Sequence, residues 1–388
     1  MSLGSTCAIV GVGDTAFVRG TERSTFELHL EASLAAIADA GISPSDIDGI
    51  VPNSLAGRPV EEFVKNLGLG EVRYSVTIPM GGASFLASLQ NACMALATGQ
   101  ANYVLLPCGR RGYSGERIST GQAVWSPAME TMRDFEVPMG NVGAVQWFAQ
   151  AAQRHMHQYG TTSAQLGHVA VNSRNNANLN PHALMYSKTL TLEQHQASRI
   201  IASPFRLFDC SLESDGAGAI IVTTVERARD LRREVVEVVG IASSHTARPT
   251  SLTEKQDMTV VEGLRDAGAR ALRMADLTID DADCLIIHEG FSWYVIAALE
   301  ALGVVGLGEG GPYVEEGHIR LDGRTPVNPH GGALGEGHAS GVNHVIEAVR
   351  QLRGSVEIVR QIADCRNVVV ANEGGFFDGA VAVLGRGL

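Results

Sequence analysis

The sequence lacks the features that mark several large classes of protein. Its six cysteines form no Cys-x-x-Cys pair, so neither a zinc ribbon nor a disulfide framework is indicated. Acidic residues outnumber basic ones by 42 to 30, and without a long basic run no nucleic-acid partner is expected. No apolar run reaches the roughly 18 residues of a membrane span, and residues 1–13 lack a signal-peptide pattern. We therefore expect a soluble protein with no membrane span, most simply cytoplasmic with reduced thiols.

The chain does contain many hydrophobic residues and many glycines. Of its 388 residues 45% are hydrophobic, enough for a sizeable core, and 44 are glycine, more than the usual share of roughly 7%. Gly11 and Gly13 fit a loose dinucleotide-binding pattern. About a dozen residues separate them from the next predicted helix, whereas that fingerprint needs the helix to begin at the glycines. We interpret this segment as a structural turn.

Strands alternate with helices along most of the chain, which favours a mostly parallel sheet covered on both faces. Residues 110–200 differ, because they are polar, rich in Gln, Asn and His, and mainly helical in pattern. We interpret them as an insertion over the sheet. The predicted strands are 8–11, 49–51, 103–107, 217–224, 235–241, 284–287, 368–371 and 380–384, and the predicted helices are 26–40, 84–98, 258–275, 291–302 and 341–353.

An internal repeat decides the predicted architecture. Residues 36–51 align without a gap with residues 271–286, at an offset of 235, with four identical positions. A second match follows in the same order, because 81–84 (GGAS) and 337–340 (GHAS) each open a helix that precedes an apolar strand. These matches predict a duplicated α/β protein in which equivalent helix N-termini meet near the middle.

Three segments of the C-terminal half carry candidate chemistry: 287–292 (IHEGFS), 326–341 (PVNPHGGALGEGHASG) and 371–375 (ANEGG). Two of them follow buried strands, where ligands gather in α/β folds. Together with 214–217 (SDGA), they resemble segments of the thiolase superfamily, specifically its sterol-carrier and lipid-transfer-type branch. The resemblance implies a duplicated, five-layered αβαβα thiolase fold with a helical loop domain. It also implies a division into residues 1–230, including an insertion at about 110–205, and residues 231–388.

The sequence departs from the family at both of its catalytic cysteines. The nucleophile position, at the start of the helix near Ala83, falls on Gly82, or on Gly81 if the alignment slips by one residue. The second cysteine is replaced by the 372–374 (NEG) segment. We interpret Cys93 as a core residue.

The resemblance assigns roles to the remaining polar groups. His288 and His338 match the residues that contact the thioester carbonyl oxygen, and Glu373 lies where a base is needed. The alternatives are two satisfied core histidines and a loop-capping carboxylate. Backbone groups of three glycines are expected to help at the oxyanion, and no metal is expected; these glycines are Gly82, Gly374 and Gly375.

The leading hypothesis is an enzyme that cleaves or forms a C–C bond in a β-hydroxyacyl-CoA through an enolate, as cysteine-less aldolases of this branch do. The alternatives are an acyltransferase that uses another cysteine, such as Cys108 or Cys210, and a non-catalytic or lipid-carrying subunit. The resemblance further implies a coenzyme A thioester as substrate with no permanently bound cofactor, a homodimer or higher oligomer, and a possible small zinc-ribbon/OB-fold partner. Candidate contacts for the CoA phosphates are Arg110, Arg111, Arg174 and Arg206.

Overall fold

Nine strands form one continuous sheet, in the order β3-β2-β4-β7-β1-β8-β11-β10-β9, in the computed structural model of this chain. The structure describes residues 4–53, 58–115, 117, 130, 132–231, 234–245, 255–374 and 378–387. The strands are β1 (Cys7–Asp14), β2 (Gly49–Ile50), β3 (Tyr74–Ser75), β4 (Tyr103–Arg111), β7 (Asp215–Thr224), β8 (Val236–Ser244), β9 (Cys284–His288), β10 (Asn367–Glu373) and β11 (Gly379–Arg386).

The helices alternate with these strands, as the sequence pattern predicts. In the N-terminal half they are α1 (Thr25–Ala40), α2 (Val60–Leu67) and α3 (Ser84–Ala97). The insertion between β4 and β7 contributes α5 (Ala144–Tyr159), α6 (Ser163–Ala177) and α7 (Leu192–Ala197), with a separate small sheet of β5 (Ile200–Ala202) and β6 (Phe205–Arg206). The C-terminal half contains α8 (Val225–Ala228), α9 (Glu262–Ala275), α10 (Ser292–Ala301), α11 (Gly310–Glu315), α12 (Gly332–Gly335) and α13 (Val342–Leu352).

The prediction of a mostly parallel sheet is wrong. Strands β2–β3, β2–β4 and β9–β10 pair in parallel, but β4–β7, β7–β1, β1–β8, β8–β11 and β11–β10 pair antiparallel. The reason lies in two returning strands. Strand β11 follows β10 after a short connection that has no room for the helical crossover that a parallel neighbour requires. Strand β7 returns antiparallel alongside β4 after the helical insertion.

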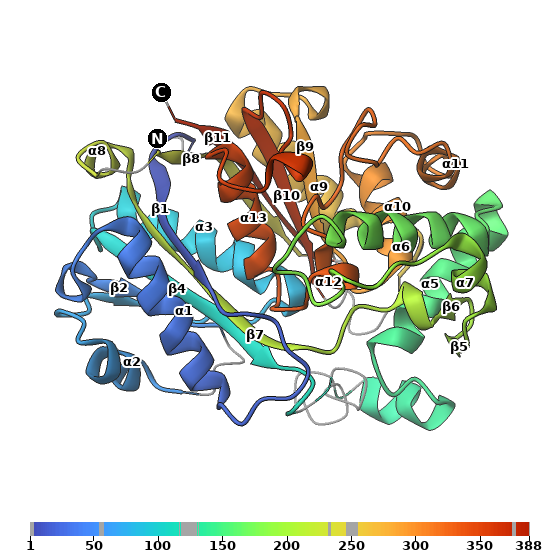
Figure 1. Cartoon of the computed structure of the whole chain (residues 1–388), viewed down its shortest axis with the longest axis horizontal. Helices are drawn as coiled ribbons and strands as arrows, with labels where there is room; N and C mark the ends of the chain where they lie inside the picture. Colours follow the sequence, from blue (N-terminus) through green and yellow to red (C-terminus); the bar gives the residue numbers. More distant parts are fainter. Residues whose placement is uncertain are drawn as a thin grey trace.

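The sheet and helices stack in five layers, which confirms the predicted duplicated thiolase fold. Helix α1 packs on one face of the N-terminal strands. Helices α3 and α13 lie together in the middle, against the opposite face of those strands and one face of the C-terminal strands. Helices α9 and α10 cover the remaining face. Successive buried residues of a strand point to opposite faces of the sheet. Leu285 therefore belongs to the core beneath α9 and α10, and Ile286 belongs to the core around α3 and α13. In Figure 1 the insertion helices lie to one side of this stack, and the two chain ends lie close together.

The two copies of the repeat adopt the same local structure. Each is a helix that ends in a left-handed residue, then a 3-10 turn opened by a capping box, then a strand. In each copy, an aspartate before that strand accepts hydrogen bonds from backbone N–H groups at the start of the neighbouring parallel strand. The equivalent positions, 235 residues apart, are Gly41/Asp276, Ser43/Thr278, Asp46/Asp281 and Asp48/Asp283.

Gly11 and Gly13 allow helix α1 to approach strand β1 closely. A Cβ on Gly11 would lie 2.3 Å from the carbonyl oxygen of Ala36, and one on Gly13 would lie 2.4 Å from the Ala36 nitrogen. These glycines therefore serve packing. Both lie within strand β1, so the interpretation of this segment as a turn is wrong. The domain boundary near residue 230 stays a prediction.

Candidate active site

Two histidines that are 50 positions apart in the chain meet at the centre of the molecule. His288 is the last residue of β9, and His338 lies in the loop before α13; both are buried. Their Nε2 atoms are 3.0 Å apart, and their ring centroids are 5.1 Å apart. The structure thus brings together the two imidazoles that the sequence singled out.

Both rings are neutral near pH 7. Burial lowers the pKa of His288 and of His338 well below 6.5, and the nearby Arg110 guanidinium lowers both further. Two neutral imidazoles at 3.0 Å share a single proton, so one Nε2 donates and the other accepts. The Oγ of Ser211 lies 3.4 Å from Nδ1 of His338, and the backbone N–H of His338 donates to the Oγ of Ser214. The His338 ring is therefore held at both its side chain and its backbone.

Gly82 lies directly against this pair, in the turn that leads into α3. A Cβ at this position would lie 2.4 Å from the carbonyl oxygen of Glu373, and 3.2 and 3.3 Å from the Cε1 and Nδ1 atoms of His288. The Nδ1 atom of His288 has no well-aligned hydrogen-bond partner among the described residues, although the Gly82 backbone approaches it and opposes part of the decrease in its pKa. The place where a thiolase-like nucleophile would stand is thus filled by backbone.

Glu373 ends strand β10 next to β9, where Asn372 is in register with His288. Burial raises the pKa of the Glu373 carboxyl well above its ordinary value, and its Oε2 atom has no hydrogen-bond partner among the described residues. Its Oε1 atom is the one described atom within 4 Å of a Cβ built on Gly290, at 4.0 Å. The carboxyl therefore lies beside Gly290, with no other described atom within 4 Å of that Cβ position.

The two remaining glycines of the predicted site contribute less. The backbone N–H of Gly374 donates to the carbonyl of Asp378 at 2.7 Å, so in this state it is used within its own loop. Gly375 lies outside the described residues. Asn372 donates through Nδ2 to the Gly82 carbonyl at 3.4 Å, and its Oδ1 is buried without a described partner.

A buried amide and carboxylate brace the end of β9. Asn328, at a φ of +50°, holds Ile287 through both backbone groups, with Oδ1 accepting at 2.8 Å and Nδ2 donating at 2.9 Å. Glu289 accepts from Asn328, from the Leu334 backbone and from Nε2 of His344. Burial raises the pKa of Glu289 to about 8 and lowers that of His344 to about 3. Glu289 thus braces the loop that follows β9.

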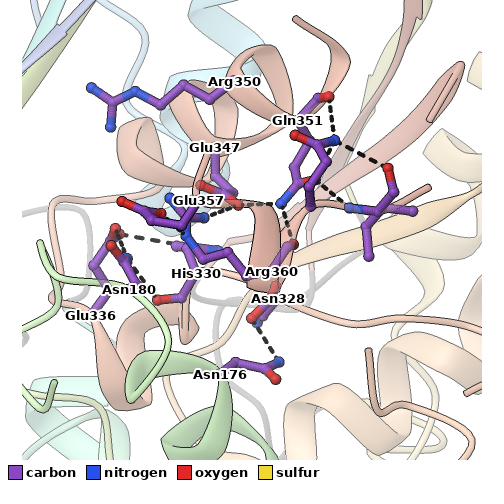
Figure 2. A network of polar contacts seen from close by, with 12 residues as sticks. Asn176, Asn180, Asn328, His330, Glu336, Glu347, Arg350, Gln351, Glu357 and Arg360 are labelled. Atoms are coloured by element: carbon purple, nitrogen blue, oxygen red, sulfur yellow. Dashed lines mark hydrogen bonds and ion pairs between the residues drawn. The ribbon is translucent and has the colours of Figure 1, made fainter. Parts of the chain in front are cut away.

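A further polar network lies behind the site, and Figure 2 shows it at close range. On one side Glu336 accepts from Asn180 and Asn343, and its Oε2 lies 3.9 Å from the buried His330. On the other side Arg360 forms ion pairs with Glu347 and Glu357, and Gln351 donates to Glu347 at 2.8 Å. Burial raises the pKa of Glu336 to about 8.

None of the candidate cysteines has a reactive environment. Cys93 is buried beside Cys7, whose hydrogen bond, together with burial, raises the Cys93 pKa well above its usual value. Burial raises the pKa of Cys108 and of Cys210 to about 12. A thiol that stays protonated is a poor nucleophile, which argues against an acyl-cysteine at these positions.

The four arginines proposed for CoA phosphates already have acceptors within the protein. Arg110 lies 3.9 Å from the Glu213 carboxylate, and the other three donate to backbone carbonyls. The phosphate contacts therefore stay unassigned.

Sequence reasoning quoted Asn328, His330 and Asn372 within motifs but gave them no role, and it missed His344. The Asn-Pro-His-Gly-Gly run signalled an unusual turn. The contacts of these residues join segments that are distant in the sequence, and no local sequence pattern indicates such contacts. Within the described ranges, no helix is long and apolar enough to span a membrane, and no three His, Cys, Asp or Glu side chains are grouped to hold a metal.

Comparison with known proteins identifies the family of this chain. Residues 7–203 match the family description "Thiolase, N-terminal domain", and residues 240–386 match "Thiolase C-terminal domain-like". The chain is 37% identical to a steroid side-chain-cleaving aldolase of Thermomonospora curvata, with 94% of each chain covered. It is 35% identical to the 17-hydroxy-3-oxo-4-pregnene-20-carboxyl-CoA lyase of Mycobacterium tuberculosis, over 95% of this chain and 96% of that one.

Two further relatives widen the comparison. An acetyl-CoA acetyltransferase of Methanothermobacter thermautotrophicus is also 35% identical, over 95% of this chain and 96% of that one. The solved structure of the Ltp2-ChsH2(DUF35) aldolase matches with a TM-score of 0.94 at 35% identity, covering 100% of this chain and 99% of that one. On the evidence of both matched domains and of these full-length relatives, the chain belongs to the thiolase family.

Proposed function

We propose that this protein cleaves a β-hydroxyacyl-CoA by a retro-aldol reaction, without forming a covalent acyl-enzyme. The observation that carries the proposal is the closed nucleophile position. At Gly82 the Glu373 carbonyl occupies the space that a cysteine side chain would need, while two imidazoles and a buried carboxyl stand around it. Groups that bind a carbonyl oxygen and move a proton are retained, and the group that would hold an acyl chain is lost.

The proposed reaction needs one base and one oxyanion site. Glu373, in its ionised form, removes the proton of the β-hydroxyl group. The Cα–Cβ bond then breaks, the β-carbon becomes a ketone or aldehyde, and the electron pair moves onto the thioester as an enolate. Protonation of the enolate at Cα gives the shortened acyl-CoA. A carboxylate whose pKa is raised is a stronger base than an ordinary glutamate, which suits this step.

His338 and His288 are the proposed donors to the enolate oxygen. Their Nε2 atoms bond to each other, so the thioester oxygen must replace that contact. Donation from both rings requires both protons on Nε2, which leaves Nδ1 of His338 free to accept from Ser211. Neutral donors in a water-poor site stabilise developing negative charge at little reorganisation cost, and loss of one such donor costs about 3 kcal/mol in other enzymes.

The relatives support this choice of chemistry. Two of them are named for C–C cleavage, one for cleaving a steroid side chain and one as a lyase for a hydroxylated CoA thioester. We propose that the substrate of this chain is likewise a CoA thioester with a β-hydroxyl group. The solved aldolase includes a DUF35 partner, and we propose a homodimer or larger assembly of this chain that works with a small partner of that kind.

Acyl transfer is the second candidate, because one relative is named an acetyl-CoA acetyltransferase. It would need a cysteine nucleophile other than the missing pair, and the high thiol pKa values of Cys108 and Cys210 oppose it. Incubation with acetyl-CoA followed by intact-mass spectrometry separates the two, since acyl transfer requires an acetylated chain and retro-aldol cleavage requires an unmodified one.

The direct test is cleavage of β-hydroxyacyl-CoA substrates, with and without the small partner protein. The proposal expects a carbonyl product and a shortened acyl-CoA in equal amounts. It fails if no such substrate is cleaved in either condition while CoA thioesters still bind.

A further inference from the structure

Asp209 is a fully buried carboxylate that neither the motifs nor the proposed reaction uses. It ends the 3-10 turn Leu207–Asp209, between β6 and β7. Its Oδ1 atom accepts from the Oγ of Ser292 at 2.6 Å and lies 2.8 Å from Nε2 of the buried His195. Its Oδ2 atom accepts from the backbone N–H of Arg206 at 2.7 Å. Both oxygens are thus paired, as a buried carboxylate requires.

The neighbours of His195 set the direction of its bond to Asp209. Nε2 of Gln196 donates to the backbone carbonyl of Ser163 at 2.9 Å and lies 3.2 Å from Nδ1 of His195. Because an amide nitrogen only donates, Nδ1 accepts and the proton of the ring lies on Nε2. Asp209 therefore receives three donors, from α7, from α10 and from the backbone of its own turn.

The two residues after Asp209 run alongside the loop that follows β9. Cys210 forms an antiparallel bridge with Phe291, and the backbone N–H of Ser211 donates to the carbonyl of Gly290 at 2.9 Å. The residue after Phe291 is the serine that bonds to the Asp209 side chain, so backbone and side-chain contacts join the same two segments. The position of Ser211 relative to the end of β9 is therefore fixed.

Ser211 extends this contact to the two imidazoles of the candidate site. Its Oγ lies 3.4 Å from Nδ1 of His338, whose Nε2 lies 3.0 Å from Nε2 of His288. We propose that Ser211 is a positioning residue for His338, that Asp209 holds it in place, and that its hydroxyl donates to Nδ1. This inference rests on the proposed function, in which His338 donates to the thioester oxygen.

The physical effect of Ser211 is to select the tautomer of His338. A neutral imidazole carries its proton on either nitrogen, and a hydroxyl that donates to Nδ1 leaves that proton on Nε2. The Nε2–H form stabilises negative charge on the substrate oxygen, whereas the Nδ1–H form presents a lone pair to it. The bond from the His338 backbone N–H to Ser214 holds the main chain but leaves the position of the ring proton open.

The first test compares Ser211→Ala with Ser211→Thr in protein that contains ¹⁵N-labelled histidine. Nuclear magnetic resonance separates protonated from unprotonated ring nitrogens, and His338→Gln identifies the resonances of this ring. We expect Nε2–H with a hydrogen-bonded Nδ1 in the parent and in Ser211→Thr. In Ser211→Ala the Nδ1 shift should move and the Nδ1–H form should appear. A proton on Nδ1 in the parent, or an unchanged spectrum in Ser211→Ala, overturns the inference.

Asp209→Asn tests the anchor, with Glu300→Gln as the matched control. Glu300 also pairs with a buried histidine of the insertion, His155, at 3.1 Å, but it lies at the opposite end of α10. Both variants should lower the melting temperature, because each places an amide N–H among buried donors. Only Asp209→Asn should change the His338 resonances. An unchanged His338 spectrum in Asp209→Asn, or an equal change in Glu300→Gln, overturns the role of Asp209.

The Ser211 variants are then assayed for cleavage. We expect kcat to fall roughly tenfold in Ser211→Ala with KM unchanged, because the hydroxyl acts on the ring rather than on bound substrate, and Ser211→Thr to restore most of it. An unchanged kcat in Ser211→Ala overturns the positioning role. If the spectra change as expected in a protein that cleaves no β-hydroxyacyl-CoA, the Ser211–His338 contact is supported and the proposed function is refuted instead.

Discussion

Restoring the family's cysteine by Gly82→Cys should not restore thiolase chemistry. The new Cβ would begin 2.4 Å from the Glu373 carbonyl oxygen, closer than real Cβ contacts come, and 3.2 Å from the His288 ring. Either β10 or the turn before α3 must move to admit it. Overpacking of this kind typically costs about 1–3 kcal/mol. With an unfolding entropy of roughly 2 cal/mol/K per residue, that cost lowers the melting temperature of a chain this size by about 1–4 °C.

The matched control is Gly290→Ala. A Cβ at residue 290 meets one described atom within 4 Å, Oε1 of Glu373 at 4.0 Å, so it adds a methyl group without a clash. We expect Gly290→Ala to keep the parent's melting temperature but to raise KM, because the methyl group enters the space beside the base. Gly82→Ala should show the instability of Gly82→Cys without its thiol. The reasoning is refuted if Gly82→Cys is as stable as the parent and is acetylated by acetyl-CoA.

Three further predictions follow from the same geometry. His288→Ala and His338→Ala should each lower kcat/KM for cleavage by roughly 10²–10³-fold, measured by release of the carbonyl product, and a smaller effect than tenfold would remove these rings from the oxyanion site. Cleavage should increase with pH through the raised pKa of Glu373, since its ionised form is the base; a rate that does not change with pH, or that survives in Glu373→Gln, contradicts that role. Glu336 has a pKa of about 8 when folded against about 4.5 when unfolded, so between these values the folded state binds the extra proton and the free energy of unfolding should decline as the pH rises from about 4.5 to about 8. Glu336→Gln should reduce that decline in urea titrations, and an unchanged slope would show that Glu336 is ionised in the native state.

Much of this fold could be predicted because the chain repeats itself. The paired positions from Gly41/Asp276 to Asp48/Asp283 are local signals: a left-handed residue, a capping box and an acid that holds the next strand. Each can be recognised within a few residues, and the repeat then implies the layers. The alternation of strands and helices in the sequence does not indicate the direction in which a strand runs. The antiparallel pairing of β7 with β4 and of β11 with β10 was therefore missed, and the parallel sheet was predicted wrongly.

The candidate site likewise has features that the sequence predicts and features that it does not. His288, His338 and Glu373 stand at element ends in recognisable segments, so the sequence identified them together. The direct contact between the two Nε2 atoms and the carbonyl that closes the Gly82 position depend on how β9, β10 and α3 approach each other.

The most direct test of the central claim is a single-turnover experiment on a β-hydroxyacyl-CoA, with products followed by liquid chromatography and the protein by intact-mass spectrometry. Our account predicts stoichiometric carbonyl compound and shortened acyl-CoA, with the chain unmodified at every time point. An acylated chain that forms and decays with turnover would contradict it.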